Sequence, residues 1–246
     1  MSSDLSTLIL FVGMILSAVL SMYFALRILY ATRGSNKGWL FYAVFGIANA
    51  LNSFAGIIRN VLAQEAAVKA VLVVQSIMLL IVTVSIMLAL TILAEVFGLS
   101  NKIFSRKNIL ICSGILLLAL IVLDLSSFST ARLYSSAGIF FIAGLILTVV
   151  PLWKIMVNTH VLPWRLLFAS HLTAIVSMYL IFATLGCCSG VLHGSALCPS
   201  ITSPGYFTIS PCSAGFAGLY SGYLMLLLVA SWLQTGAFYF VHRRLH

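Results

Sequence analysis

Charged side chains are scarce in this 246-residue chain, and acidic ones are the scarcest. Lysine, arginine, aspartate and glutamate together make up 7% of the residues, and only four residues are acidic. A soluble domain carries about 25% charged residues, so this chain cannot cover itself with an ordinary water-facing surface. The composition therefore excludes a water-soluble globular enzyme.

Motifs for several familiar chemistries are also missing from the sequence. It contains no G-x-S-x-G nucleophile motif, no H-E-x-x-H zinc motif and no C-x-x-C pair. No lysine follows Lys154, which excludes a retinal Schiff base in the last helix. We therefore expect no catalytic residues and no metal site, and the sequence argues against an enzyme.

Apolar residues are what the sequence has in excess, at 62% of the chain. They form seven runs long enough to cross about 30 Å of hydrocarbon, separated by short polar breaks. The sequence thus predicts an all-α, polytopic membrane bundle that fills residues 1–246 as one domain. The expected transmembrane helices span residues 7–30, 39–60, 67–97, 107–127, 134–157, 163–187 and 214–241.

The basic residues predict the orientation of this bundle. An odd number of spans puts the termini on opposite sides, and positive charge collects on the cytoplasmic side. With the N-terminus outside, ten basic residues are cytoplasmic: Arg27, Arg33, Lys37, Lys102, Arg106, Lys107, Lys154, Arg165, Arg243 and Arg244. Only Arg59, Lys69 and Arg132 are outside. We expect a multi-pass protein of the cell membrane with a cytoplasmic C-terminus, and no binding of nucleic acid.

Four of the five cysteines fall at or beyond the outer end of the sixth run. An even number of cysteines on the oxidising side indicates two disulfides, which join Cys187 and Cys188 to Cys198 and Cys212 in one of two crossings. They would staple the outer loop, residues 188–213. A redox site is the alternative. The loop has no charged residue between Cys188 and Cys212, so we expect it to fold over the bundle or to contact another subunit.

His171 is the histidine placed deepest within a predicted span. It lies about 12 Å into the sixth run. A hydrogen-bonded packing role is the simpler interpretation. The alternative is contact with a haem b or a quinone, and a haem would need its second ligand from another span or another subunit.

Polar side chains on the second run share one helical face because of their spacing. These residues are Asn49, Asn52 and Ser53, and Gln75 of the third run could meet them. They could line a cavity for a small ligand, but hydrogen bonds between helices are a sufficient explanation.

Small residues recur every four positions at the start of the last run, at Ala214, Gly218 and Gly222. Such a stripe lets a second helix approach closely, either within the bundle or from another chain. Together these features predict a non-catalytic membrane subunit that anchors or braces a larger assembly of membrane subunits. The alternatives are an electron-transfer or quinone-linked subunit that uses His171, and a seven-helix sensor or small-molecule permease.

Overall fold

The computed structural model describes residues 2–32, 37–61, 65–99, 107–111, 113–115, 118, 130–191 and 214–245. These residues are almost entirely α-helical and none of them forms a β-strand, which confirms the all-α class. Residues 107–111 and 113–115 are helical as well. The long helices are α1 (Ser2–Thr32), α2 (Lys37–Val61), α3 (Glu65–Val96), α5 (Thr130–Thr159), α6 (Leu162–Val191) and α7 (Ala214–Leu245).

Within the described residues, five helices contain stretches that are long and apolar enough to cross a bilayer. The shortest stretch has 22 residues, which is about 33 Å of helix and exceeds the hydrocarbon thickness of about 30 Å. Five such helices mark the chain as a membrane protein. The stretches are Ile9–Thr32, Lys37–Ile58, Lys69–Val96, Ala137–Thr159 and Gly222–Leu245.

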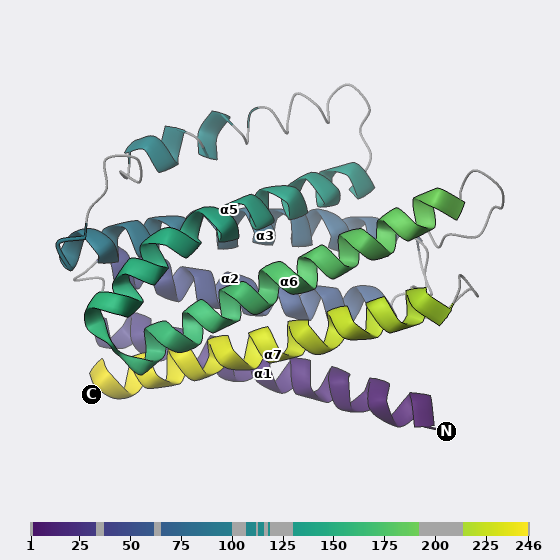
Figure 1. Ribbon diagram of the computed structural model, residues 1–246, viewed down its shortest axis with the longest axis horizontal. Coiled ribbons are helices and arrows are strands. Elements are labelled where there is room, and N and C mark those ends of the chain that lie inside the picture. Colours follow the sequence, from purple (N-terminus) through teal and green to yellow (C-terminus); the bar gives the residue numbers. More distant parts are fainter. Residues whose placement is uncertain are drawn as a thin grey trace.

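The six long helices form a closed ring. The main contacts join neighbours in the order α1, α2, α3, α5, α6, α7 and back to α1, and α2 also meets α6 and α7 inside the ring. Figure 1 shows these helices running roughly along one common axis, with the two termini at opposite ends of the bundle. Contact between the first and last helices closes the ring, so distant parts of the sequence depend on each other.

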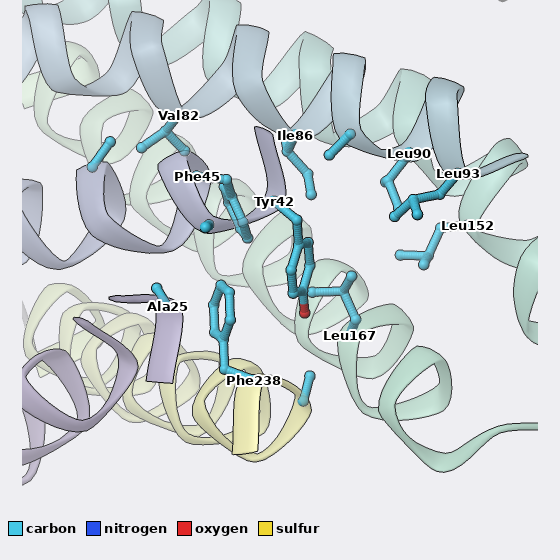
Figure 2. Close-up of a cluster of buried hydrophobic side chains, with 14 of the residues drawn as sticks. Ala25, Tyr42, Phe45, Val82, Ile86, Leu90, Leu93, Leu152, Leu167 and Phe238 are labelled. Atoms are coloured by element: carbon cyan, nitrogen blue, oxygen red, sulfur yellow. The ribbon is translucent and has the colours of Figure 1, made fainter. Parts of the chain in front are cut away.

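Among the five apolar stretches, the one in α3 is the most enclosed. Side chains over 72% of its apolar stretch are buried, against 28% for α1. One reason is that Ile109 packs against Met87 and Leu88 of α3 from outside the ring. The main apolar cluster fills the centre of the bundle, and Figure 2 shows it drawing on several ring helices, with Tyr42, Ile86, Leu152, Leu167 and Phe238 among its members.

Two tight turns shape one end of the bundle. Helix α3 stops where Gly98 takes a positive φ of 69°, and the Leu99 amide then bonds back to the Ala94 carbonyl at 2.8 Å. This is a Schellman cap, for which glycine has no steric penalty. Between α5 and α6 the chain reverses at His160, which also has a positive φ, of 52°. Both turns lie beside a pocket described below.

Candidate functional site

A row of hydroxyl groups joins α1 to α7. The hydroxyl oxygens of Ser21 and Thr235 are 2.7 Å apart, and that of Ser17 is 3.1 Å from Thr235. Ser17 also bonds to the Ser231 hydroxyl. We call these four residues the hydroxyl seam. Ser17, Ser21 and Thr235 are buried, and in an apolar surrounding a hydroxyl without a partner would cost free energy, so the seam ties the two helices together.

An amide pair continues this connection to α2. Asn49 donates from its side-chain nitrogen to the side-chain oxygen of Gln234 at 3.1 Å. Gln234 directly precedes Thr235 of the hydroxyl seam. The Ser53 hydroxyl donates to the main-chain carbonyl of Asn49 one turn earlier, at 3.0 Å. Helices α1 and α2 are thus each hydrogen-bonded to α7, through residues that are adjacent in its sequence.

The predicted polar face of α2 also reaches α3. The Gln75 side-chain nitrogen lies 3.4 Å from the main-chain carbonyl of Asn52, and Gln75 is buried. The side-chain oxygen of Asn52 is buried and has no hydrogen-bond partner among the described residues. The structure therefore brings Asn49, Asn52, Ser53 and Gln75 together where α2 meets α3 and α7.

Helix α6 places His171 in the interior of the bundle. The side chain is 2% exposed, and its Nδ1 atom lies 2.9 Å from the Leu167 carbonyl oxygen. A carbonyl oxygen only accepts, so Nδ1 carries the proton and donates. In neutral histidine the other nitrogen, Nε2, then has a free lone pair. That atom is buried and has no hydrogen-bond partner within the described ranges.

This tautomer decides what His171 could bind. A lone pair on Nε2 suits a metal ion such as haem iron, or a ligand hydroxyl that donates a proton. It does not suit a quinone carbonyl, which needs a donor. A backbone carbonyl that accepts from Nδ1 is also the usual support of a metal-bound histidine. Over the described part of the chain, no three His, Cys, Asp or Glu side chains gather closely enough to hold a metal ion by themselves.

Glycines mark where helices approach most closely. A Cβ atom at Gly46 of α2 would lie 2.5 Å from Cζ of Phe238 and 2.9 Å from Cβ of Ala25. A Cβ at Gly144 of α5 would overlap the side-chain methyl of Thr83 on α3. Only glycine allows these backbones to approach so closely.

Gly222 belongs to the predicted small-residue stripe of α7. It faces α6, because a Cβ built there would lie 3.5 Å from Cδ1 of Leu180. Ala214 and Gly218 are in the first turns of the same helix, and their packing lies outside the described residues. The contact that the structure describes for the stripe is thus within the chain.

The cysteine predictions fall largely outside the described residues. Cys187 and Cys188 lie near the end of α6, which continues to Val191, four residues beyond its predicted end. Cys198 and Cys212 belong to the segment 192–213, which the structure does not describe. The two predicted disulfides and the stapled outer loop 188–213 remain predictions.

Aromatic rings surround Tyr42 near the start of α2. The Tyr42 ring is 4.6 Å from that of Phe238 and 6.2 Å from that of Trp164, between ring centroids. Figure 2 shows Tyr42 reaching across the cluster toward α6 and α7. Its hydroxyl is buried without a hydrogen-bond partner among the described residues. Aromatic packing therefore holds α2, α6 and α7 together at this level.

Comparisons with known proteins found no family model, no curated protein and no solved structure that matches this chain.

Sequence reasoning missed the hydroxyl seam and the close glycine contacts. The seam has a signal in the sequence, because Ser17 and Ser21 are four residues apart, as are Ser231 and Thr235. Such spacing puts each pair on one helical face. The pairing of α1 with α7 has no comparable signal, because it depends on how the ring closes.

Proposed function

We propose that this chain is a non-catalytic integral membrane subunit that anchors or braces a larger membrane assembly. The observation that supports it best is that interior polar side chains form hydrogen bonds between helices. In the hydroxyl seam and the Asn49–Gln234 pair, side chains of α1, α2 and α7 bond to one another. Others bond within their own helix, as the Thr83 hydroxyl does with the Leu79 carbonyl at 2.7 Å. The bonds between α1, α2 and α7 hold those three helices together, as a scaffold requires.

Outward-facing residues add a second argument. Large apolar side chains are exposed on α1, α2, α3, α5, α6 and α7, so the bundle presents an apolar face to lipid or to other membrane helices. In α1 these exposed residues recur along the whole helix and include Leu16, Val19, Tyr23, Leu26 and Tyr30. A surface of this kind suits a subunit that is surrounded by hydrocarbon and by partner helices.

The assembly is tested by purifying the full chain from its own membrane in mild detergent. We expect other membrane subunits to remain bound, and mass spectrometry of the purified sample would identify them. A repeat in a harsher detergent should release those partners while the bundle stays folded. A lone, stable monomer in the mild detergent would contradict the proposal.

The proposed topology has seven transmembrane helices, the N-terminus outside and the C-terminus in the cytoplasm of the cell membrane. The termini lie at opposite ends of the bundle (Figure 1), as an odd number of crossings requires. Basic residues support the direction, since the last turn of α7 contains His242, Arg243 and Arg244. The apolar outer loop, stapled by its cysteines, would then contact partners outside.

A reporter domain fused after His246 tests the direction. A reporter that is active only in the cytoplasm should work there, and one that is active only outside should not. The matched fusions before Met1 should give the opposite pattern. Activity of the outside reporter at the C-terminus would reverse the proposed topology.

A second candidate is an electron-transfer subunit in which His171 ligates a haem iron. The buried Nε2 atom favours it, because its lone pair is available to ligate a metal and it has no hydrogen-bond partner among the described residues. A second ligand would come from another span or from a partner subunit. A quinol hydroxyl that donates to Nε2 is the form of quinone contact that this tautomer allows.

The absorption spectrum of the reduced, purified protein tests this candidate. A haem α band that His171→Leu abolishes, and that the turn variant His160→Gln retains, would support ligation by His171. An extractable quinol whose amount falls in His171→Leu would support the quinol contact instead. A spectrum without a haem band, together with no extractable quinone, would leave His171 as a packing residue.

A further inference from the structure

A pocket of about 230 Å³ opens at the end of the bundle that carries the chain's C-terminus. It lies where the start of α2, the end of α3, the α5–α6 turn and the end of α7 meet. Among the described residues that line it are Trp39, Phe97, Pro163, Trp164, Val241 and Arg244. These described walls are almost wholly apolar, and Arg244 is the one cation among the described lining residues.

Two stacked tryptophans form part of this wall. The rings of Trp39 and Trp164 are stacked with centroids 5.9 Å apart and planes 22° from parallel. Phe97 meets Trp164 edge-on at 6.4 Å. Tryptophan prefers the headgroup level of a bilayer, where its ring contacts acyl chains and its N–H reaches polar groups. Trp39 is partly exposed, Trp164 is buried, and the basic last turn of α7 lies at the same end of the bundle, so the pocket suits the level where a lipid changes from tail to headgroup.

Arg244 gives the pocket its charge. It is exposed, it lines the pocket, and Arg243 stands beside it in the last turn of α7. No acidic side chain is among the described residues that line the pocket. An arginine stem can lie along an apolar wall while its guanidinium holds a phosphate through two parallel hydrogen bonds. The cavity therefore complements an amphiphile with an apolar tail and a negative head.

We propose that this pocket binds one anionic phospholipid of the surrounding leaflet. Its phosphate meets Arg244, and the first part of an acyl chain lies against Trp39, Trp164 and Val241. A zwitterionic lipid fits the apolar wall equally well, but its headgroup also brings a cation toward Arg243 and Arg244. The binding depends only on the bundle being in a bilayer, and not on the anchoring role proposed above.

Tryptophan fluorescence gives a direct test with the full chain in lipid vesicles. Trp153 and Trp232 are 51% and 39% exposed on the outside of the bundle, so any lipid can reach them. The Trp153→Phe/Trp232→Phe variant leaves emission from Trp39 and Trp164. Bromine atoms on acyl chains quench tryptophan at contact, so brominated phosphatidylglycerol and brominated phosphatidylcholine are compared at equal mole fraction.

We expect the anionic lipid to quench with about fivefold higher apparent affinity, the preference that one basic residue near a membrane surface provides. Arg244→Gln should reduce this preference to about one. Arg243→Gln is the matched control, because Arg243 is also exposed but is not among the residues that line the pocket, and it should keep most of the preference.

Three results would overturn the proposal. Equal quenching by the two lipids would mean that the pocket takes lipid without selecting charge. If Arg243→Gln and Arg244→Gln reduced the preference for the anionic lipid equally, that preference would come from the general surface potential and not from the pocket. Quenching by neither lipid would mean that a protein segment, from this chain or from a partner, covers the tryptophan pair.

Discussion

Helix α7 meets α1 and α2, two of the helices that it contacts, in different ways. Toward α1 it presents hydroxyl groups, and Thr235 bonds to both Ser17 and Ser21. Toward α2, one turn further along, Phe238 fills the space above Gly46 so closely that no further atom fits. The contact with α1 is made by hydrogen bonds. The Gly46–Phe238 contact with α2 is made by the fit of apolar surfaces, next to the single hydrogen bond of the Asn49–Gln234 pair.

The difference shows which interaction stabilises each contact in a membrane. Lipid tails are as apolar as the helices, so burial from water contributes nothing to helix association there, and tight packing and hydrogen bonds remain. A hydrogen bond between membrane helices contributes about 0.6 kcal/mol on average. An atom added to a full contact costs about 1–3 kcal/mol. We therefore expect the aromatic contact to be far less tolerant of change than the hydroxyl seam.

Gly46→Ala should have the largest effect. The added Cβ would lie within 3 Å of two ring atoms of Phe238 and of the Ala25 methyl, and neither group is flexible. We expect the free energy of unfolding to fall by about 3 kcal/mol. The measurement is an unfolding titration of the purified protein with a denaturing detergent.

Gly138→Ala of α5 is the control for that variant. A Cβ at Gly138 would meet nothing within 4 Å, so the same chemical change should leave stability unchanged or raise it by up to about 1 kcal/mol through helix propensity. Equal losses at Gly46 and Gly138 would show that the Phe238 contact is not closely packed.

Gly144→Ala should come next, because its new Cβ overlaps only one group, the Thr83 methyl. We expect a loss of about 2 kcal/mol in the same titration. Thr83→Ser removes that methyl and keeps a hydroxyl for the Leu79 carbonyl. The Gly144→Ala/Thr83→Ser double variant should therefore recover most of the loss. If the two substitutions instead lower the free energy of unfolding additively, the loss in Gly144→Ala does not come from contact with the Thr83 methyl.

The amide pair should show the smallest effect. We expect a double-mutant cycle between Asn49→Ala and Gln234→Ala to give a coupling free energy of about 0.6 kcal/mol, the usual contribution of a hydrogen bond between membrane helices. Pairing Asn49→Ala with Thr235→Val provides the control, since Asn49 bonds to Gln234 and not to Thr235. A coupling free energy well above the stability loss measured for Gly46→Ala would contradict the expectation that the apolar contact matters more than the polar one.

The sequence predicted much of the fold and less of the site. Long apolar runs indicate helices of membrane length, because a helix satisfies all of its own backbone groups in lipid. The spacing of Asn49, Asn52 and Ser53 predicted their shared face, but not that Gln234 of α7 would meet Asn49. The tautomer of His171 could not be predicted from the sequence either, because it depends on the carbonyl of Leu167 one turn earlier in α6.

Composition and periodicity by themselves determined that this chain belongs in a membrane and that it is helical. Both follow from local physics, namely the cost of placing charge or unbonded backbone in hydrocarbon. Only the tertiary structure decided which helices touch, that α1 closes onto α7, and that Trp39 and Trp164 line a pocket with Arg244. Those contacts join residues far apart in the chain, and they depend on how side chains of particular shape fit together across the ring.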